Sequence, residues 1–189
     1  MRRFSVRPAI TLKGRKFKGI RGWAGKPFHP PLTDFPIAAY VLAAAFEVVS
    51  VVGGDDRSWG RDFWHAGTYV FIGGAAMSVL AALTGLFDWL RSSEPGTQAR
   101  RTANTHATIM VSVTVLALAN IALRLNGYNT EASTPVAIMV LSLVTAGLVS
   151  WGATYGGTLV FDYGFNVETA GDSPVWHESE TDVLPGDDH

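Results

Sequence analysis

The feature that most constrains the fold is an apolar stretch of 25 residues from Ala66 to Leu90, which holds one charged residue, Asp88, near its end. As an α-helix this stretch would be roughly 37 Å long, enough to cross the hydrocarbon core of a bilayer. Helices in soluble proteins rarely need so long an apolar run. The sequence therefore predicts a transmembrane helix over residues 66–90.

Three further apolar stretches, each bounded by glycine, proline or polar connections, predict three more transmembrane helices. The four predicted spans cover residues 36–52, 66–90, 103–125 and 135–155. Together they predict an all-α integral membrane bundle of four helices. The proline-rich segment 29–36 is predicted to be an extended lead-in to the first helix, which would begin near Pro36. Gly156–Gly157 is expected to end the fourth.

Small residues recur at intervals of three or four along the stretch 66–90 and form one helical face. These residues are Gly74, Ser78, Ala81, Ala82 and Gly85. In lipid, small residues mark the places where helix backbones approach each other closely. The helix over 66–90 is therefore predicted to have a tightly packed neighbour.

The charged residues are distributed unevenly. Residues 1–35 hold nine of the fifteen Lys and Arg, whereas residues 153–189 hold eight of the sixteen acids and no Lys or Arg. We expect a basic arm over 1–28 and a four-helix domain over 29–167. Residues 168–189 form an acidic tail whose ordering we expect to require a protein partner.

Several function classes find no support in the sequence. The chain has no cysteine, so it can form no disulfide, thiolate metal site or iron–sulfur cluster. It contains no motif typical of serine hydrolases, P-loop NTPases, zinc proteases or dinucleotide-binding enzymes. The basic arm borders a span, so we expect contact with the bilayer rather than with nucleic acid.

Strongly polar residues inside the spans are costly in lipid unless they meet a partner or water. We expect a buried polar network made of Asp34, Glu47, Asp88, Asn120 and Arg124. A contact between Glu47 and either Arg124 or Asn120 would satisfy both partners and hold helices together. An alternative is a proton or ion pathway through Glu47 and Asp88.

Two histidines are predicted to lie at the same depth on different helices. His29 precedes the first span and His106 lies in the third, which is the minimum for bis-histidine ligation of a b-type haem between helices. Met110, one turn from His106, is a second conceivable axial ligand. An alternative is a packing network in which His106 bonds Asp88 or Asp34. A zinc site lacks the usual His/Glu pair three or four residues apart.

Short motifs occur in a characteristic order along the chain. They are HPPLTDFPI before and into the first span, GLFDWL at the end of the second, RRTANTH at the start of the third and GGTLVFDYGFNV after the fourth. In residues 25–167 this order resembles the bacterial membrane family called domain of unknown function twenty-two thirty-one. Members often have GHPLHP where this chain has GKPFHP, so the first of those two histidines is absent here, as is one often found near Tyr163.

The resemblance implies a redox setting, because some relatives are fused to Rieske iron–sulfur modules. Our first hypothesis is therefore a small subunit of a larger redox or respiratory complex in the inner membrane, without a catalytic motif of its own. Its partners would be other membrane subunits and the lipid bilayer. The alternatives are an electron carrier with haem on His29 and His106, and the pathway through Glu47 and Asp88.

The charge distribution predicts the topology of the chain in the membrane. Residues 1–35 and the connection 91–101 hold twelve Lys and Arg, against three elsewhere in the chain. Positively charged connections stay in the cytoplasm. Reporter fusions after Gly54, Pro95, Asn129 and His189 should therefore report outside, inside, outside and inside in that order. A periplasmic reporter at His189 would contradict this prediction.

Overall fold

The computed structural model describes residue 20 and residues 27–166 of the 189-residue chain. Almost all of the predicted basic arm, residues 1–28, and all of the predicted acidic tail, residues 168–189, lie outside the described residues.

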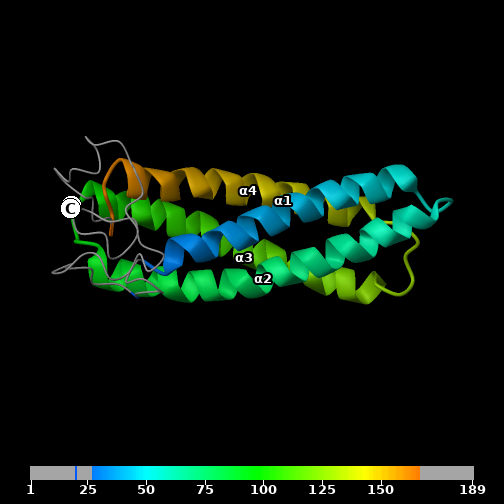
Figure 1. Cartoon of the computed structure of the whole chain (residues 1–189), viewed down its shortest axis with the longest axis horizontal. Coiled ribbons are helices and arrows are strands. Elements are labelled where there is room, and N and C mark those ends of the chain that lie inside the picture. The colour runs from blue at the N-terminus through cyan, green and yellow to red at the C-terminus, as the bar shows by residue number, and fades with distance from the viewer. Residues whose placement is uncertain (1–19, 21–26, 167–189) are drawn as a thin grey trace, which may run out of the picture.

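The described part of the chain is a bundle of four long helices with no β-strand (Figure 1). The helices are α1 (His29–Gly53), α2 (Ser58–Ser92), α3 (Gln98–Gly127) and α4 (Val136–Phe161). All four are long and apolar enough to cross a membrane. The prediction of an all-α bundle of four transmembrane helices is confirmed.

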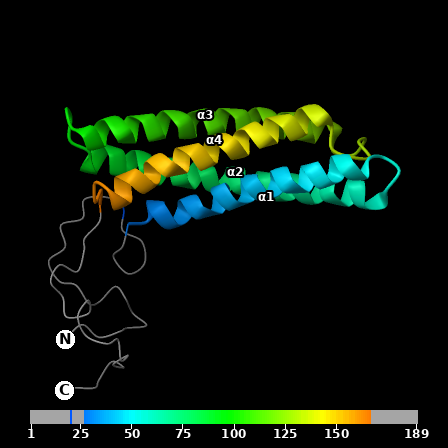
Figure 2. The ribbon, with the colours of Figure 1, turned by 90° about the horizontal axis from the view of Figure 1, so that it is seen from above.

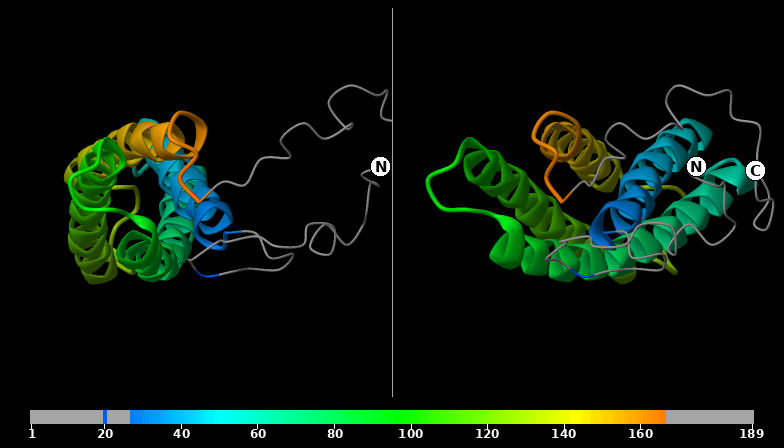
Figure 3. Two further views of the ribbon diagram at one scale, coloured as in Figure 1. Left: turned by 90° about the vertical axis from the view of Figure 1, so that its left-hand side faces the viewer. Right: turned by 60° about the vertical axis from the view of Figure 1, so that its left-hand side comes forward.

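Each helix packs against its two neighbours around the bundle. The α1–α2 contact is the most extensive, followed by α3–α4 and α1–α4, and the α2–α3 contact is the smallest. Helices α1 and α3 therefore lie on one diagonal of the bundle, and α2 and α4 on the other (Figure 3). We call the end with the start of α1, the end of α4 and the α2–α3 connection the terminal end, and the opposite end the loop end (Figure 2).

Helix α1 begins at His29, so the predicted extended lead-in over 29–36 is wrong. Pro30 and Pro31 lie in the first helical turn, where a backbone N–H would have no partner within the helix and its loss costs nothing. Within this first turn the Thr33 hydroxyl donates to the Pro30 carbonyl oxygen at 2.7 Å. The early start moves His29 from a loop onto a helix.

Helix α4 continues through Gly156–Gly157 to Phe161, so the prediction that these glycines end the helix is also wrong. In lipid a broken helix would leave backbone groups without partners, and this favours continuation. Helices α1 and α3 end at Gly53 and Gly127, one and two residues beyond the predicted spans 36–52 and 103–125. Gly54 has a φ of +60°, a conformation that glycine adopts without strain.

An apolar layer fills the middle of the bundle between the two ends. It consists of Tyr40, Ala43, Phe71, Val113, Ala117 and Val149, which are all fully buried or nearly so. The rings of Tyr40 and Phe71 are 4.9 Å apart between centroids, a favourable aromatic contact. The Tyr40 and Ser78 hydroxyls share a hydrogen bond of 2.9 Å, so the one polar atom of the layer's side chains is satisfied.

The predicted small-residue face of α2 packs on α1, apart from Ala82, which is exposed. A Cβ atom placed on Gly74 would lie 2.7 Å from the Cβ of Ala39 on α1. The adjacent Gly73 faces open space. Close packing of backbones therefore holds α1 and α2 together at Gly74.

This contact generates a prediction with an adjacent control. Gly74→Ala should destabilise the bundle by about 1–3 kcal/mol, because the added methyl group forces α1 and α2 apart. Gly73→Ala should leave stability unchanged or raise it slightly, since alanine favours helices. Unfolding of the purified protein in detergent micelles measures both. Equal stability of the two variants would show that the close approach of α1 and α2 at Gly74 does not contribute to the stability of the bundle.

Candidate functional site

Two polar sites lie inside the bundle, one on each side of the apolar layer. Towards the loop end is the arginine cluster, made of Glu47, Thr68, Asn120, Arg124 and Ser142. Towards the terminal end is the histidine pair, His29 and His106. At 1.5 Å per residue, the two sites are roughly 27 Å apart along both α1 and α3.

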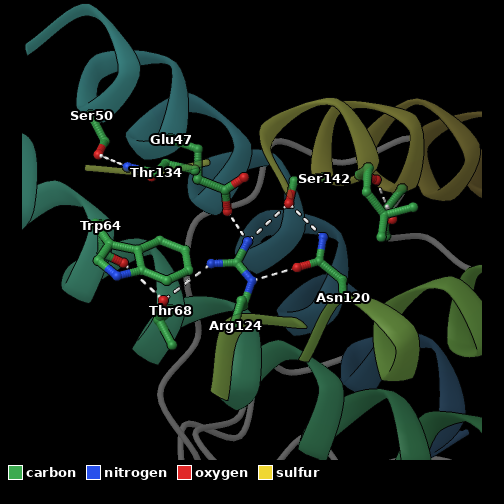
Figure 4. A network of polar contacts seen from close by, with 10 residues as sticks. Glu47, Ser50, Trp64, Thr68, Asn120, Arg124, Thr134 and Ser142 are labelled. Carbon is green, nitrogen blue, oxygen red and sulfur yellow. Dashed lines mark hydrogen bonds and ion pairs between the residues drawn. The ribbon is translucent and has the colours of Figure 1, made fainter. Parts of the chain in front are cut away.

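The arginine cluster joins all four helices through one fully buried guanidinium group (Figure 4). Arg124 of α3 forms an ion pair with the fully buried Glu47 of α1. Its Nε donates to Asn120 Oδ1 at 2.6 Å, its Nη1 to Thr68 Oγ1 of α2 at 3.3 Å and its Nη2 to Ser142 Oγ of α4 at 2.9 Å. Asn120 Nδ2 also donates to Ser142 at 2.8 Å. The cluster therefore fixes four helices at one depth.

Aromatic rings cover the guanidinium group. The Arg124 Cζ lies 4.4 Å from the centre of the Phe71 ring and 5.5 Å from that of Trp64. Cation–π contacts of this kind strengthen when water is excluded, and both rings are fully buried. The charge is thus held by the ion pair, hydrogen bonds and ring faces, and the side chain is fully buried.

The structure brings together Glu47, Asn120 and Arg124 but separates the other two predicted members of the network. Asp34 is exposed, because α1 begins at His29 and its buried positions there are Leu32 and Pro36. The prediction that Asp34 belongs to a buried network is therefore wrong.

Asp88 is buried but lies near the terminal end, far from the arginine cluster. Its Oδ1 accepts a hydrogen bond from the backbone N–H of Ile20 at 3.2 Å. This contact places a residue that precedes α1 directly against the end of α2. Asp88 therefore joins neither the arginine cluster nor the histidine pair through a hydrogen bond within the described residues.

The histidine pair has an ordered geometry in which each imidazole bonds a backbone carbonyl of the next helix. His29 Nδ1 is 2.9 Å from the carbonyl oxygen of Ala81 and 3.3 Å from Thr84 Oγ1, both on α2. His106 Nδ1 is 2.8 Å from the carbonyl oxygen of Gly152 on α4. A carbonyl oxygen can only accept, so Nδ1 carries the proton on both rings. In the neutral imidazole, each Nε2 then has a lone pair available to a ligand.

The two rings belong to diagonal helices, and both are partly buried. Neither ring has a carboxylate hydrogen-bond partner within the described residues, unlike the packing network predicted with Asp34 or Asp88. The Met110 sulfur lies close to Gly152, since a Cβ on that glycine would be 2.8 Å from it. Met110 therefore packs on α4.

Several of the groups that form these two sites were not predicted from the sequence. For Ser142 a signal existed, because it lies in a row of small residues on α4. The carbonyl groups of Ala81 and Gly152 carry no signal, since every residue has one. Gly85 and Gly156, which lie beside the two imidazoles, were assigned to helix packing and to a helix end.

Four helices that are long and apolar enough to cross a membrane define a multi-pass integral membrane protein. The family described as "Predicted membrane protein (DUF2231)" matches residues 25–169, which include all four helices. The chain belongs to this family, so the resemblance found from its motifs is confirmed. No curated protein and no solved structure gives a significant match to the chain.

The arginine cluster generates a prediction about stability. Glu47→Ala should lower the free energy of unfolding by about 3 kcal/mol or more, because it leaves the Arg124 charge buried without its counter-ion. Glu47→Gln should cost less, since the amide oxygen still accepts from the guanidinium group. Asp34→Ala, an exposed acid on the same helix, serves as the control. Unfolding in mixed micelles measures all three, and equal values for Glu47→Ala and Asp34→Ala would contradict the prediction.

Proposed function

We propose that this protein binds one b-type haem between α1 and α3, with His29 and His106 as axial ligands, and carries electrons within the membrane. The observation that carries the proposal is the shared geometry of the two imidazoles. Each donates its Nδ1 proton to a backbone carbonyl and has Nε2 left for the iron.

The Nδ1 hydrogen bonds prepare both rings for ligation. A histidine that binds a metal usually donates its other ring N–H to a carbonyl or carboxylate, which fixes the tautomer and the ring plane and makes the ligating nitrogen more basic. Here that partner is a carbonyl within a transmembrane helix, held in place by the helix itself. Both rings have this support before any ligand arrives.

The number of histidines also suits haem. The porphyrin supplies four nitrogen ligands to the iron, so the protein needs only two. A metal held by protein alone needs about three or more side chains. Within residue 20 and residues 27–166, no group of three or more His, Asp or Glu side chains could hold a metal ion.

The position of the pair in the bundle supports the same function. Cofactors of four-helix bundles lie in the core between facing helices, and α1 and α3 face each other across the diagonal (Figure 3). The apolar layer lies between the pair and the loop end. Apolar surroundings exclude water from a haem and thereby influence its reduction potential.

The geometry argues against the pathway through Glu47 and Asp88. Glu47 is engaged by Arg124, and the fully buried apolar layer separates the arginine cluster from the terminal end, where Asp88 lies. The Tyr40 and Ser78 hydroxyls at that layer bond each other, and among the described contacts neither bonds Glu47 or Asp88, so they do not link the two carboxylates. The arginine cluster is better explained as the contact that holds the four helices together.

The hypothesis of a subunit in a larger redox complex extends the haem proposal. A membrane electron carrier must exchange electrons with a donor and an acceptor, which in this proposal are other proteins of the inner membrane. The acidic tail over 168–189, whose ordering we expect to require a protein partner, lies outside the described residues. The proposal therefore rests on the histidine pair alone.

An optical spectrum of the full chain, purified from cells that make haem, tests the proposal. We expect a reduced-minus-oxidised spectrum with the sharp visible band of a six-coordinate b-type haem. His29→Ala and His106→Ala should each abolish or weaken that band, because one axial ligand is lost. His65→Ala is the matched control, since His65 lies towards the loop end with its Nε2 3.2 Å from the Tyr128 carbonyl oxygen.

Two outcomes would contradict the haem proposal. One is a folded wild-type protein that contains no haem and takes up none when haemin is added. The other is a band that persists at full intensity in both His29→Ala and His106→Ala. Melting curves of the same samples separate loss of the ligand from loss of the fold.

A further inference from the structure

We propose that Gly85 and Gly156 are positioning residues for the two haem ligands, a role that rests on the proposed function. Each glycine leaves the space in which one imidazole ring lies, and so sets the direction in which that ring presents its Nε2. The inference comes from an arrangement that occurs twice in the bundle.

The two hairpins, α1–α2 and α3–α4, repeat one local geometry. In the first, His29 bonds the carbonyl of Ala81, and the glycine four residues later, Gly85, lies against the ring. In the second, His106 bonds the carbonyl of Gly152, and Gly156 occupies the equivalent place. Residues four apart on a helix lie one above the other on the same face. Each ring is therefore held by a carbonyl on one side and meets a glycine one turn away.

The distances show how closely the glycines are fitted. A Cβ atom on Gly85 would lie 2.7 Å from Cε1 of His29 and 3.1 Å from each of its ring nitrogens. A Cβ on Gly156 would lie 3.3 Å from Cε1 of His106. Carbon atoms in contact prefer roughly 3.5–4.0 Å. A methyl group at Gly85 must therefore displace the His29 ring, whereas one at Gly156 asks for a shift of a few tenths of an ångström.

Displacement of the ring matters because Cε1 lies between the two nitrogens. A push on that atom moves Nδ1 away from its carbonyl acceptor and turns Nε2 at the same time. The weaker Nδ1 bond makes Nε2 less basic, and the turned ring binds the iron at a changed angle. Both effects would reach a bound haem through the His29 ring.

The chain offers matched controls on the same two helices. Gly73 on α2 and Gly147 on α4 are exposed and face open space, so an added methyl group meets nothing there. Replacement of glycine by alanine within a helix changes the helix propensity by a similar amount at each position. Comparison within each helix therefore isolates the contact with the imidazole.

The experiment uses the haem-loaded full chain and four variants: Gly85→Ala, Gly156→Ala, Gly73→Ala and Gly147→Ala. Paramagnetic resonance of the oxidised haem and a potentiometric titration are the two readouts. We expect Gly85→Ala to shift the low-spin signal and the midpoint potential, or to produce high-spin haem. Gly156→Ala should give a smaller change of the same kind. Both controls should match the wild type.

Should Gly85→Ala fold poorly, the variant that combines it with His29→Ala decides the question. Removal of the ring removes the clash, so this double variant should melt where His29→Ala alone melts. Melting losses that simply add would overturn the proposal.

The remaining outcomes separate the two proposals. A wild-type haem protein in which Gly85→Ala leaves both readouts unchanged, or in which Gly73→Ala changes them equally, overturns the positioning role and leaves the proposed function standing. A wild-type protein that binds no haem overturns the proposed function, and the positioning role with it.

Discussion

The structure depends on one constraint, which is that lipid offers no partner to a polar group. The constraint acts most directly on Arg124, because a buried guanidinium group must find every partner within the protein. It finds them on all four helices, at Glu47, Thr68, Asn120 and Ser142. A single side chain thereby sets the depth of each helix relative to the others. The same constraint keeps α4 helical through two consecutive glycines.

The apolar layer divides the interior into two parts of different character. On the side of the loop end, the polar atoms of Arg124 and Asn120 are engaged with one another and with their neighbours. On the side of the terminal end, the Nδ1 atoms of His29 and His106 bond backbone carbonyls, and this leaves each ring with a second nitrogen. On the side of the loop end, Glu47 Oε2 and Trp64 Nε1 are buried without a hydrogen-bond partner within the described residues. The side of the terminal end differs because it holds two imidazoles, each with one nitrogen fixed by a backbone carbonyl, and this arrangement favours the histidine pair as the functional site.

Sequence reasoning predicted the helices better than it predicted which face of each helix is buried and which residues that face contacts. Long apolar stretches predict a membrane span whatever the details of packing, and the cost of burying Glu47 requires a partner. The rotation of each helix about its axis decides which side chains are buried and which groups they contact. It turns Asp34 outward and brings His29 and His106 to carbonyl groups 52 and 46 residues away in sequence. Backbone acceptors have no residue type, and the proline-rich start of α1 has the composition of a loop, so neither could be recognised beforehand.

The repeat of one local geometry in the two hairpins has a consequence for assembly. Each hairpin carries half of the histidine pair together with the carbonyl and the glycine that support it. Each pair of neighbouring helices that inserts as a hairpin would prepare one imidazole independently. The α1–α4 and α2–α3 contacts that must then join the hairpins are the two smallest in the bundle. A ligand held by one histidine from each hairpin would link the two hairpins. Such a ligand would bind only when the two hairpins have packed together in the correct register.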